Sequence, residues 1–158
     1  MIKKIPKNTS CFTYHNENPK DKRSSDCVLR AISLASGKSW DEVLDDLVIL
    51  SHKYKEMPND KKCYGKYLES LGFEMQKQPR QYDNTKYTGK EFCNLLNGLY
   101  INSVTGAMVS CDIVAKIGGH HLVAIRLDED NKYKIFDIWD STDGSIGNYW
   151  IRRRKNNG

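Results

Sequence analysis

The sequence has no long hydrophobic run. Nowhere do about 18 consecutive apolar residues occur, the length that a membrane-spanning helix needs. The first seven residues, Met1 to Lys7, also lack the apolar stretch of a secretory signal. We therefore expect a protein without a membrane partner that remains in the cytoplasm.

Closely spaced cysteines are absent as well. The five cysteines are at least 16 residues apart, so there is no CxxC motif, and their odd number leaves one thiol over in any full disulfide pairing. This favours a reduced, intracellular setting. Asp112, Asp140 and Asp143 lack the spacing of metal ligands and are predicted to be turn and surface residues. The sequence thus predicts neither a metal ion nor a cofactor.

The net charge of +5 is not spread evenly along the chain. Residues 1–25 carry six Lys or Arg against two acids, residues 151–158 carry four against none, and the rest has a charge of −3. Basic ends can bind nucleic acid or an acidic partner, but a solvated tail is the commoner meaning. We expect residues 1–24 to form an irregular arm and residues 152–158 a solvated basic tail.

Four segments in the first two thirds of the chain have the periodicity of helices. The first begins at Asp26, its predicted N-cap, and ends at Gly37. Capping boxes that start at Ser39 and Thr88 predict the second and fourth helices. The third helix is predicted to follow Asn59 as its cap. The first helix is the most apolar of the four and is expected to be buried and central.

Short runs rich in β-branched and aromatic residues dominate the last third. They predict antiparallel strands at residues 107–113, 121–127, 133–139 and 149–151. A further short strand is predicted at residues 73–75, and Cys11 to Tyr14 is either an edge strand or a segment laid across the core. Helices followed by strands predict one α+β domain over residues 1–158, with N-terminal helices packed on a C-terminal antiparallel sheet.

Cys27 opens the first predicted helix. A thiol attacks only as the thiolate, and the N-terminus of a helix lowers a thiol pKa. A lone cysteine in an apolar helix is more often a core residue, which is the assignment made for Cys63, Cys93 and Cys111. The negative charge of Asp26 works against a thiolate, so Cys27 needs an imidazolium partner.

His121 is the histidine best placed for that role. It stands at the mouth of an apolar strand, and Asp137 lies on the next strand. If residues 128–130 form the hairpin loop, His121 falls directly opposite Asp137, with Cβ atoms about 4.5–5.5 Å apart. A four-residue loop would pair His121 with Ile138 instead. A catalytic unit of Cys27, His121 and Asp137 therefore predicts the register of this hairpin.

These residues resemble the papain-like cysteine peptidases. Asp26-Cys27 at a helix start, His121 to Ala124 at a strand opening, and Asp137 to Trp139 on the neighbouring strand follow the order of that family. The short chain is similar to the compact members, such as bacteriocin-leader peptidases and small phage-encoded proteins. The resemblance covers residues 24–36 and 118–151. It implies a papain-like fold and, for a phage protein, the host cytoplasm as location.

The resemblance also implies a role for each residue. Cys27 would be the nucleophile, His121 the general base and then acid, Asp137 the residue that orients the imidazole, and Trp139 a cover over the His–Asp bond. Papain-like enzymes usually carry a glutamine shortly before the cysteine to help hold the oxyanion, and this chain has none there. The candidate substitutes are Asn16, Asn18 and Lys22.

The sequence thus predicts a thiol-dependent hydrolase of peptide or isopeptide bonds, with a protein or peptide as substrate. An alternative keeps the fold but not the reaction: a host-interaction protein, phage-encoded, whose triad is vestigial or performs another acyl transfer such as deamidation. A third class, nucleic-acid binding through the basic ends, predicts an affinity that falls steeply with salt.

Overall fold

The structure, a computed structural model, describes residues 4–99 and 110–154. Over these residues it is an α+β fold of four helices and one mixed six-stranded sheet. The helices are α1 (Cys27–Ser36), α2 (Trp40–Tyr54), α3 (Lys61–Ser70) and α4 (Gly89–Leu99). The strands are β1 (Phe12–Tyr14), β2 (Glu74–Gln76), β3 (Cys111–Ile117), β4 (His121–Leu127), β5 (Tyr133–Asp137) and β6 (Ile146–Arg153). No helix in these residues is long and apolar enough to cross a membrane.

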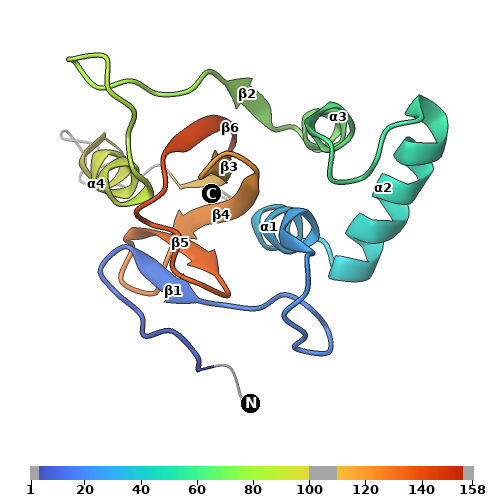
Figure 1. Cartoon of the computed structure of the whole chain (residues 1–158), viewed down its shortest axis with the longest axis horizontal. Helices are drawn as coiled ribbons and strands as arrows, with labels where there is room; N and C mark the ends of the chain where they lie inside the picture. Colours follow the sequence, from blue (N-terminus) through green and yellow to red (C-terminus); the bar gives the residue numbers. More distant parts are fainter. Residues whose placement is uncertain (1–3, 100–109, 155–158) are drawn as a thin grey trace.

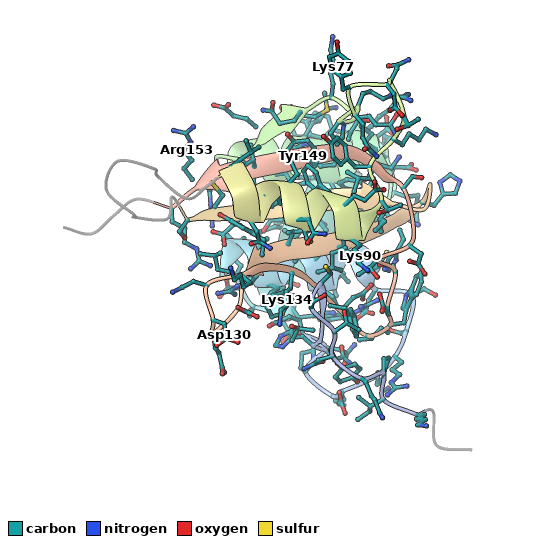
Figure 2. All side chains as sticks on the ribbon, turned by 90° about the vertical axis from the view of Figure 1, so that its left-hand side faces the viewer. Lys77, Lys90, Asp130, Lys134, Tyr149 and Arg153 are labelled. Carbon is teal, nitrogen blue, oxygen red and sulfur yellow. The ribbon has the colours of Figure 1, made fainter. Side chains whose placement is uncertain are left out.

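The sheet lies between two layers of helices. Its strand order is β1-β5-β4-β3-β6-β2. Figure 1 shows α4 on one side of the sheet and α1, α2 and α3 on the other. Figure 2 looks onto α4, which lies in front of the strands of the sheet. The last four strands pair antiparallel in the order β5-β4-β3-β6, and they form the centre of the sheet.

All four predicted helices are present. The hydroxyls of Ser39 and Thr88 each accept a hydrogen bond from the N–H group three residues on, at 3.1 and 3.2 Å. The capping box at Thr88 is complete, because Glu91 also accepts from the N–H group of Thr88 at 3.1 Å, whereas at Ser39 only the bond to the hydroxyl forms. α1 ends at Gly37, whose φ of 80° is left-handed, as expected for a C-terminal glycine. The residue that precedes α3 is Asp60 rather than the predicted Asn59.

The C-terminal strands agree with the prediction in number but not in their bounds. β4 occupies the predicted residues 121–127. The strand predicted at residues 107–113 begins at residues that lie outside the described part, and β3 continues to Ile117. It extends this far because the chain reaches its turn only at Gly118, whose φ is 61°.

Two short strands from the first half of the chain complete the sheet. β1 pairs in parallel with β5, so the stretch from Cys11 to Tyr14 includes an edge strand. β2 pairs antiparallel with β6 at the other edge. The predicted antiparallel pairing holds for the four C-terminal strands, but the whole sheet is mixed, because β1 enters it beside β5 and runs in the same direction.

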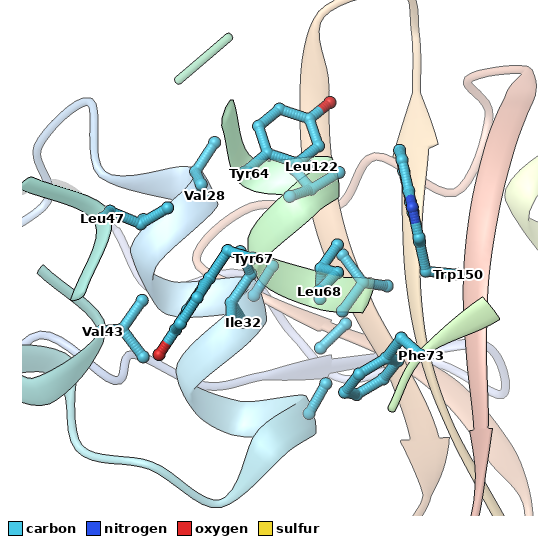
Figure 3. Packing of buried hydrophobic residues seen from close by; sticks show 14 of the residues in the cluster. Val28, Ile32, Val43, Leu47, Tyr64, Tyr67, Leu68, Phe73, Leu122 and Trp150 are labelled. Carbon is cyan, nitrogen blue, oxygen red and sulfur yellow. The ribbon is translucent and has the colours of Figure 1, made fainter. Parts of the chain in front are cut away.

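Each face of the sheet has its own hydrophobic cluster. Since side chains alternate along a strand, Leu122 and Ala124 of β4 pack on α1, whereas Val123 and Ile125 belong to the cluster on the side of α4. Figure 3 shows the first cluster, in which side chains of α1 and α3 meet those of the sheet. Full burial of a Val, Leu, Ile or Phe side chain stabilises the folded state by roughly 1.5–3 kcal/mol relative to leaving it exposed. This packing fixes α1 against β4. The three cysteines assigned to the core are buried in these clusters: Cys63, Cys93 and Cys111.

The predicted basic tail belongs in part to the sheet. Arg152 and Arg153 lie in β6, and Arg154 binds Asp112 through two nitrogens at 3.0 and 2.7 Å. Arg152 also donates to the carbonyl oxygens of Ala35 at 3.3 Å and of Leu71 at 3.1 Å. Asp112 is 3% exposed, so its prediction as a turn or surface residue is wrong. A buried carboxylate needs such partners, and Arg154 supplies two hydrogen bonds to Asp112.

Candidate active site

Cys27 is the first residue of α1 and is partly exposed, whereas the other four cysteines are buried. Asp26, directly before it, does not cap the helix through its side chain as predicted. Its carboxylate instead accepts hydrogen bonds from Arg30 at 2.8 Å, Trp40 at 2.9 Å and Asn18 at 3.0 Å. Asp26 therefore holds the loop before α1, α1 itself and the start of α2 together through its carboxylate.

His121 is positioned by the β3–β4 hairpin. Ile117 pairs directly with His121, so the loop consists of Gly118, Gly119 and His120. Both glycines have positive φ, 61° and 96°, a backbone conformation that residues with side chains rarely adopt. This tight loop brings His121 back at the start of β4. His121 then lines the same pocket as Cys27.

The register of the β4–β5 hairpin differs from both predicted alternatives. Leu127 pairs with Tyr133, so the loop has five residues, 128–132, rather than three or four. Asp128 makes this longer turn, because its Oδ1 accepts from the N–H groups of Asp130 and Lys132 at 2.9 and 3.0 Å.

His121 and Asp137 nevertheless bind each other. Their hydrogen bond joins His121 Nε2 to Asp137 Oδ2. The β4–β5 ladder ends at the pair of Ala124 and Phe136, so both residues lie beyond it. Loops of three and five residues also keep the same alternation of faces. The predicted partners are therefore in contact, although the predicted direct opposition is wrong.

Arg30 is the residue of this site that the sequence interpretation missed. Its guanidinium donates from Nη1 to Asp137 Oδ1 at 2.6 Å and from Nε to Asp26 Oδ1 at 2.8 Å. The side chains of Arg30 and Asp137 are only 7% and 2% exposed. Burial opposes the charge of Arg30, but hydrogen bonds with Asp26 and Asp137 raise its pKa. Arg30 thus keeps its charge and holds the carboxylate that orients His121.

A signal for Arg30 was present in the sequence. It is the one charged side chain on the otherwise apolar first helix, and it follows Asp26 at the i,i+4 spacing of helical ion pairs. An arginine on a buried helix requires acidic partners.

The surroundings of Cys27 favour its thiolate. Burial raises the pKa of Cys27, but hydrogen bonds with His121 and with the backbone of Leu122, and the charges of His121 and Arg30, outweigh burial and lower it. Burial also opposes the charge of His121, yet hydrogen bonds with Asp137 and Cys27 raise the pKa of His121 to about 9. Between these two pKa values the favoured state is a thiolate–imidazolium pair.

Trp139 lies beside this pair. Its ring centroid is 4.8 Å from that of His121, with an angle of 37° between the planes. The chain leaves β5 after Asp137, so Trp139 is not in the strand predicted to reach it, and it is 48% exposed. One face of His121 is therefore covered by an indole that also borders the solvent.

The three predicted oxyanion donors do not line the pocket. Asn16 donates to Lys22 O at 3.0 Å and to Asp21 at 3.2 Å, and Asn18 donates to Asp26 at 3.0 Å. Both amides thus organise the loop before α1. Lys22 is exposed on the same loop.

A pocket of about 710 Å³ opens at Cys27, within the size range of small-molecule and peptide side-chain sites. Besides Cys27, His121 and Trp139, its lining includes Ser25 before α1, Tyr64 of α3 and Lys116 of β3. In residues 4–99 and 110–154, no three His, Cys, Asp or Glu side chains come together as metal ligands would.

The fold and the site define an α+β protein with a Cys–His–Asp arrangement at the end of its central sheet. Comparison of the chain with models of protein families, with curated proteins and with solved structures gave no match.

Proposed function

We propose that the protein is a papain-like thiol hydrolase that cleaves peptide or isopeptide bonds through an acyl-enzyme at Cys27. The observation that supports this most is that Cys27 and His121 line one open pocket, while His121 is hydrogen-bonded in turn to Asp137. A nucleophile, a base and a residue that orients the base are the parts that covalent acyl transfer needs.

In the first step, the Cys27 thiolate attacks the carbonyl carbon of the substrate, and a tetrahedral oxyanion forms. The carbonyl then re-forms, the C–N bond breaks, and the His121 imidazolium gives its proton to the leaving nitrogen. This leaves a thioester on Cys27. Neutral His121 next takes a proton from water, the resulting hydroxide attacks the thioester, and the C–S bond breaks to release the acid. Asp137 keeps the imidazole in one orientation throughout.

The acyl-enzyme can be tested without knowing the substrate. p-Nitrophenyl acetate carries a reactive ester, and attack by Cys27 releases nitrophenolate and leaves an acetyl group on sulfur. We expect a burst of nitrophenolate and an acetylated Cys27 peptide by mass spectrometry. The other four cysteines serve as an internal control, because each is at most 3% exposed and should remain unmodified.

Variants separate catalysis from simple exposure. Cys27→Ala should abolish the burst, and His121→Ala should reduce it by about 10²–10⁴-fold, the usual contribution of a general base. If acetylation is absent from wild-type Cys27, or persists unchanged in His121→Ala, the hydrolase proposal is wrong. The same fold would then be that of a binding protein.

A further inference from the structure

Tyr64 is a polar residue of the pocket whose side chain belongs neither to the triad nor to a hydrogen bond within residues 4–99 and 110–154. Tyr64, on α3, lines the pocket together with Cys27 and His121. The donors predicted for the oxyanion, Asn16 and Asn18, are bound elsewhere in the loop before α1. A donor that faces the pocket from another element is therefore of interest.

The ring of Tyr64 is held firmly. The residue is 4% exposed and belongs to the hydrophobic cluster between α1, α3 and the sheet. Its ring meets that of Trp150 edge-on, at a centroid distance of 5.6 Å and an angle of 70°. A ring fixed in this way loses little conformational freedom when its hydroxyl binds a ligand.

The hydroxyl of Tyr64 points away from the packed side chains. In Figure 3 it lies at the edge of the cluster, beyond Leu122 and on the same side as Val28, the residue after Cys27. No hydrogen bond among residues 4–99 and 110–154 involves this hydroxyl, and it is not sealed from solvent. Tyr67, one turn further along α3, differs in this respect because its hydroxyl donates to Asp46 at 2.6 Å.

The local charges keep Tyr64 protonated. Burial and the negative charges of Cys27 and Asp60 raise the pKa of Tyr64 to about 12. At neutral pH the phenol is therefore a hydrogen-bond donor and not a base. Tyr64 and Cys27 also line the same pocket.

From this placement we infer that Tyr64 is a catalytic residue whose O–H stabilises the oxyanion formed when Cys27 attacks a carbonyl. This inference rests on the proposed acyl transfer at Cys27. As the C–S bond forms, the carbonyl π electrons move onto oxygen, and the phenol donates a hydrogen bond to that oxygen while keeping its proton. The phenol of Tyr64 takes the part that a glutamine has in the resembled family.

Two reagents distinguish stabilisation of the oxyanion by Tyr64 from an effect of Tyr64 on the thiolate of Cys27. Iodoacetamide reacts with a thiolate by displacement of iodide and forms no oxyanion, whereas p-nitrophenyl acetate passes through a tetrahedral oxyanion. In Tyr64→Phe, we expect the rate of iodoacetamide labelling of Cys27 to stay within about threefold of wild type at each pH. The rate of acetylation should fall by about 10²–10³-fold, the effect of losing one oxyanion donor.

The matched control is Tyr67→Phe, which removes a hydroxyl from the same helix but outside the pocket. It should leave both rates within about threefold of wild type, although it removes the hydrogen bond to Asp46. Unchanged acetylation in Tyr64→Phe would overturn the inference, as would an equal loss of both reactions. Failure of the hydrolase proposal appears differently, as absence of acetylation in the wild-type protein.

Discussion

Arg30 offers a quantitative test of the buried charge network. Arg30→Met keeps most of the side-chain volume but removes the guanidinium that joins Asp26 and Asp137. The side chains of Arg30 and Asp26 are 7% and 6% exposed, and that of Asp137 is 2% exposed. Breaking a buried ion pair from one side typically costs about 3–5 kcal/mol, because the remaining charge is left uncompensated.

This loss should be large in a denaturation experiment. With a urea dependence of about 2 kcal/mol per molar, the midpoint at pH 7 should fall by about 1.5–2.5 M. The melting temperature should fall by about 6–20 °C for a chain of this size. Arg153→Met is the matched control, since Arg153 is exposed on β6 and makes no ion pair within residues 4–99 and 110–154, and it should change stability by under about 0.5 kcal/mol.

The loss of stability in Arg30→Met should also depend on pH. Burial raises the pKa of Asp26, but hydrogen bonds from Asn18, Arg30 and Trp40 outweigh burial and lower it. Asp26 therefore stabilises the folded state above its unfolded pKa of about 3.9. This stabilisation is lost as the pH falls through the lower folded pKa. In Arg30→Met, protonation of Asp26 removes a negative charge that the guanidinium no longer compensates. The difference in unfolding free energy between Arg30→Met and wild type should therefore be greatest near pH 7 and become smaller towards about pH 4. A loss below about 1 kcal/mol, or a difference independent of pH, would refute the reasoning.

Two further substitutions test the packing of α4 and the role of Trp139. Gly89→Ala should destabilise the protein by about 1–3 kcal/mol, because the new Cβ would lie 2.6 Å from Ile135 Cδ1, whereas Gly98→Ala on the same helix, with nothing within 4 Å, should be neutral or slightly stabilising in thermal melts. Trp139→Ala should change the unfolding free energy by under about 1 kcal/mol but shift the pH profile of Cys27 labelling upwards, because water then weakens the hydrogen bond of His121. A profile identical to that of wild type would contradict the shielding role of the indole.

The parts of the fold that local rules determine could be predicted from the sequence. The helix caps at Ser39 and Thr88 depend on neighbours along the chain, as does the alternation in residues 121–127, and these elements form where expected. Alternation also brought His121 and Asp137 together as candidates. Their register could not be predicted, because it depends on the turn that Asp128 makes rather than on the strands themselves.

Interactions between distant segments were the main source of error. Asp112 and Arg154 are 42 residues apart in sequence, and each alone has the appearance of a surface residue. Arg30 binds Asp137 at a separation of 107 residues. From the sequence, only Asp26, four residues before Arg30, could be recognised as its partner. The oxyanion candidates were chosen for closeness to Cys27 in sequence, whereas Tyr64 reaches the pocket from another helix.

The thiolate–imidazolium pair is tested most directly by the rate at which iodoacetamide labels Cys27 between about pH 5 and pH 9. The pKa of Cys27 is lowered, so labelling should remain fast well below the ordinary cysteine pKa of about 8.5 and decline only as the pH falls through the lowered value. His121→Ala should return the decline to about pH 8.5 or above, and His52→Ala, on the exposed side of α2, should leave it unchanged. Labelling of the wild-type protein no faster than that of free cysteine, or a profile that His121→Ala does not alter, would contradict the account.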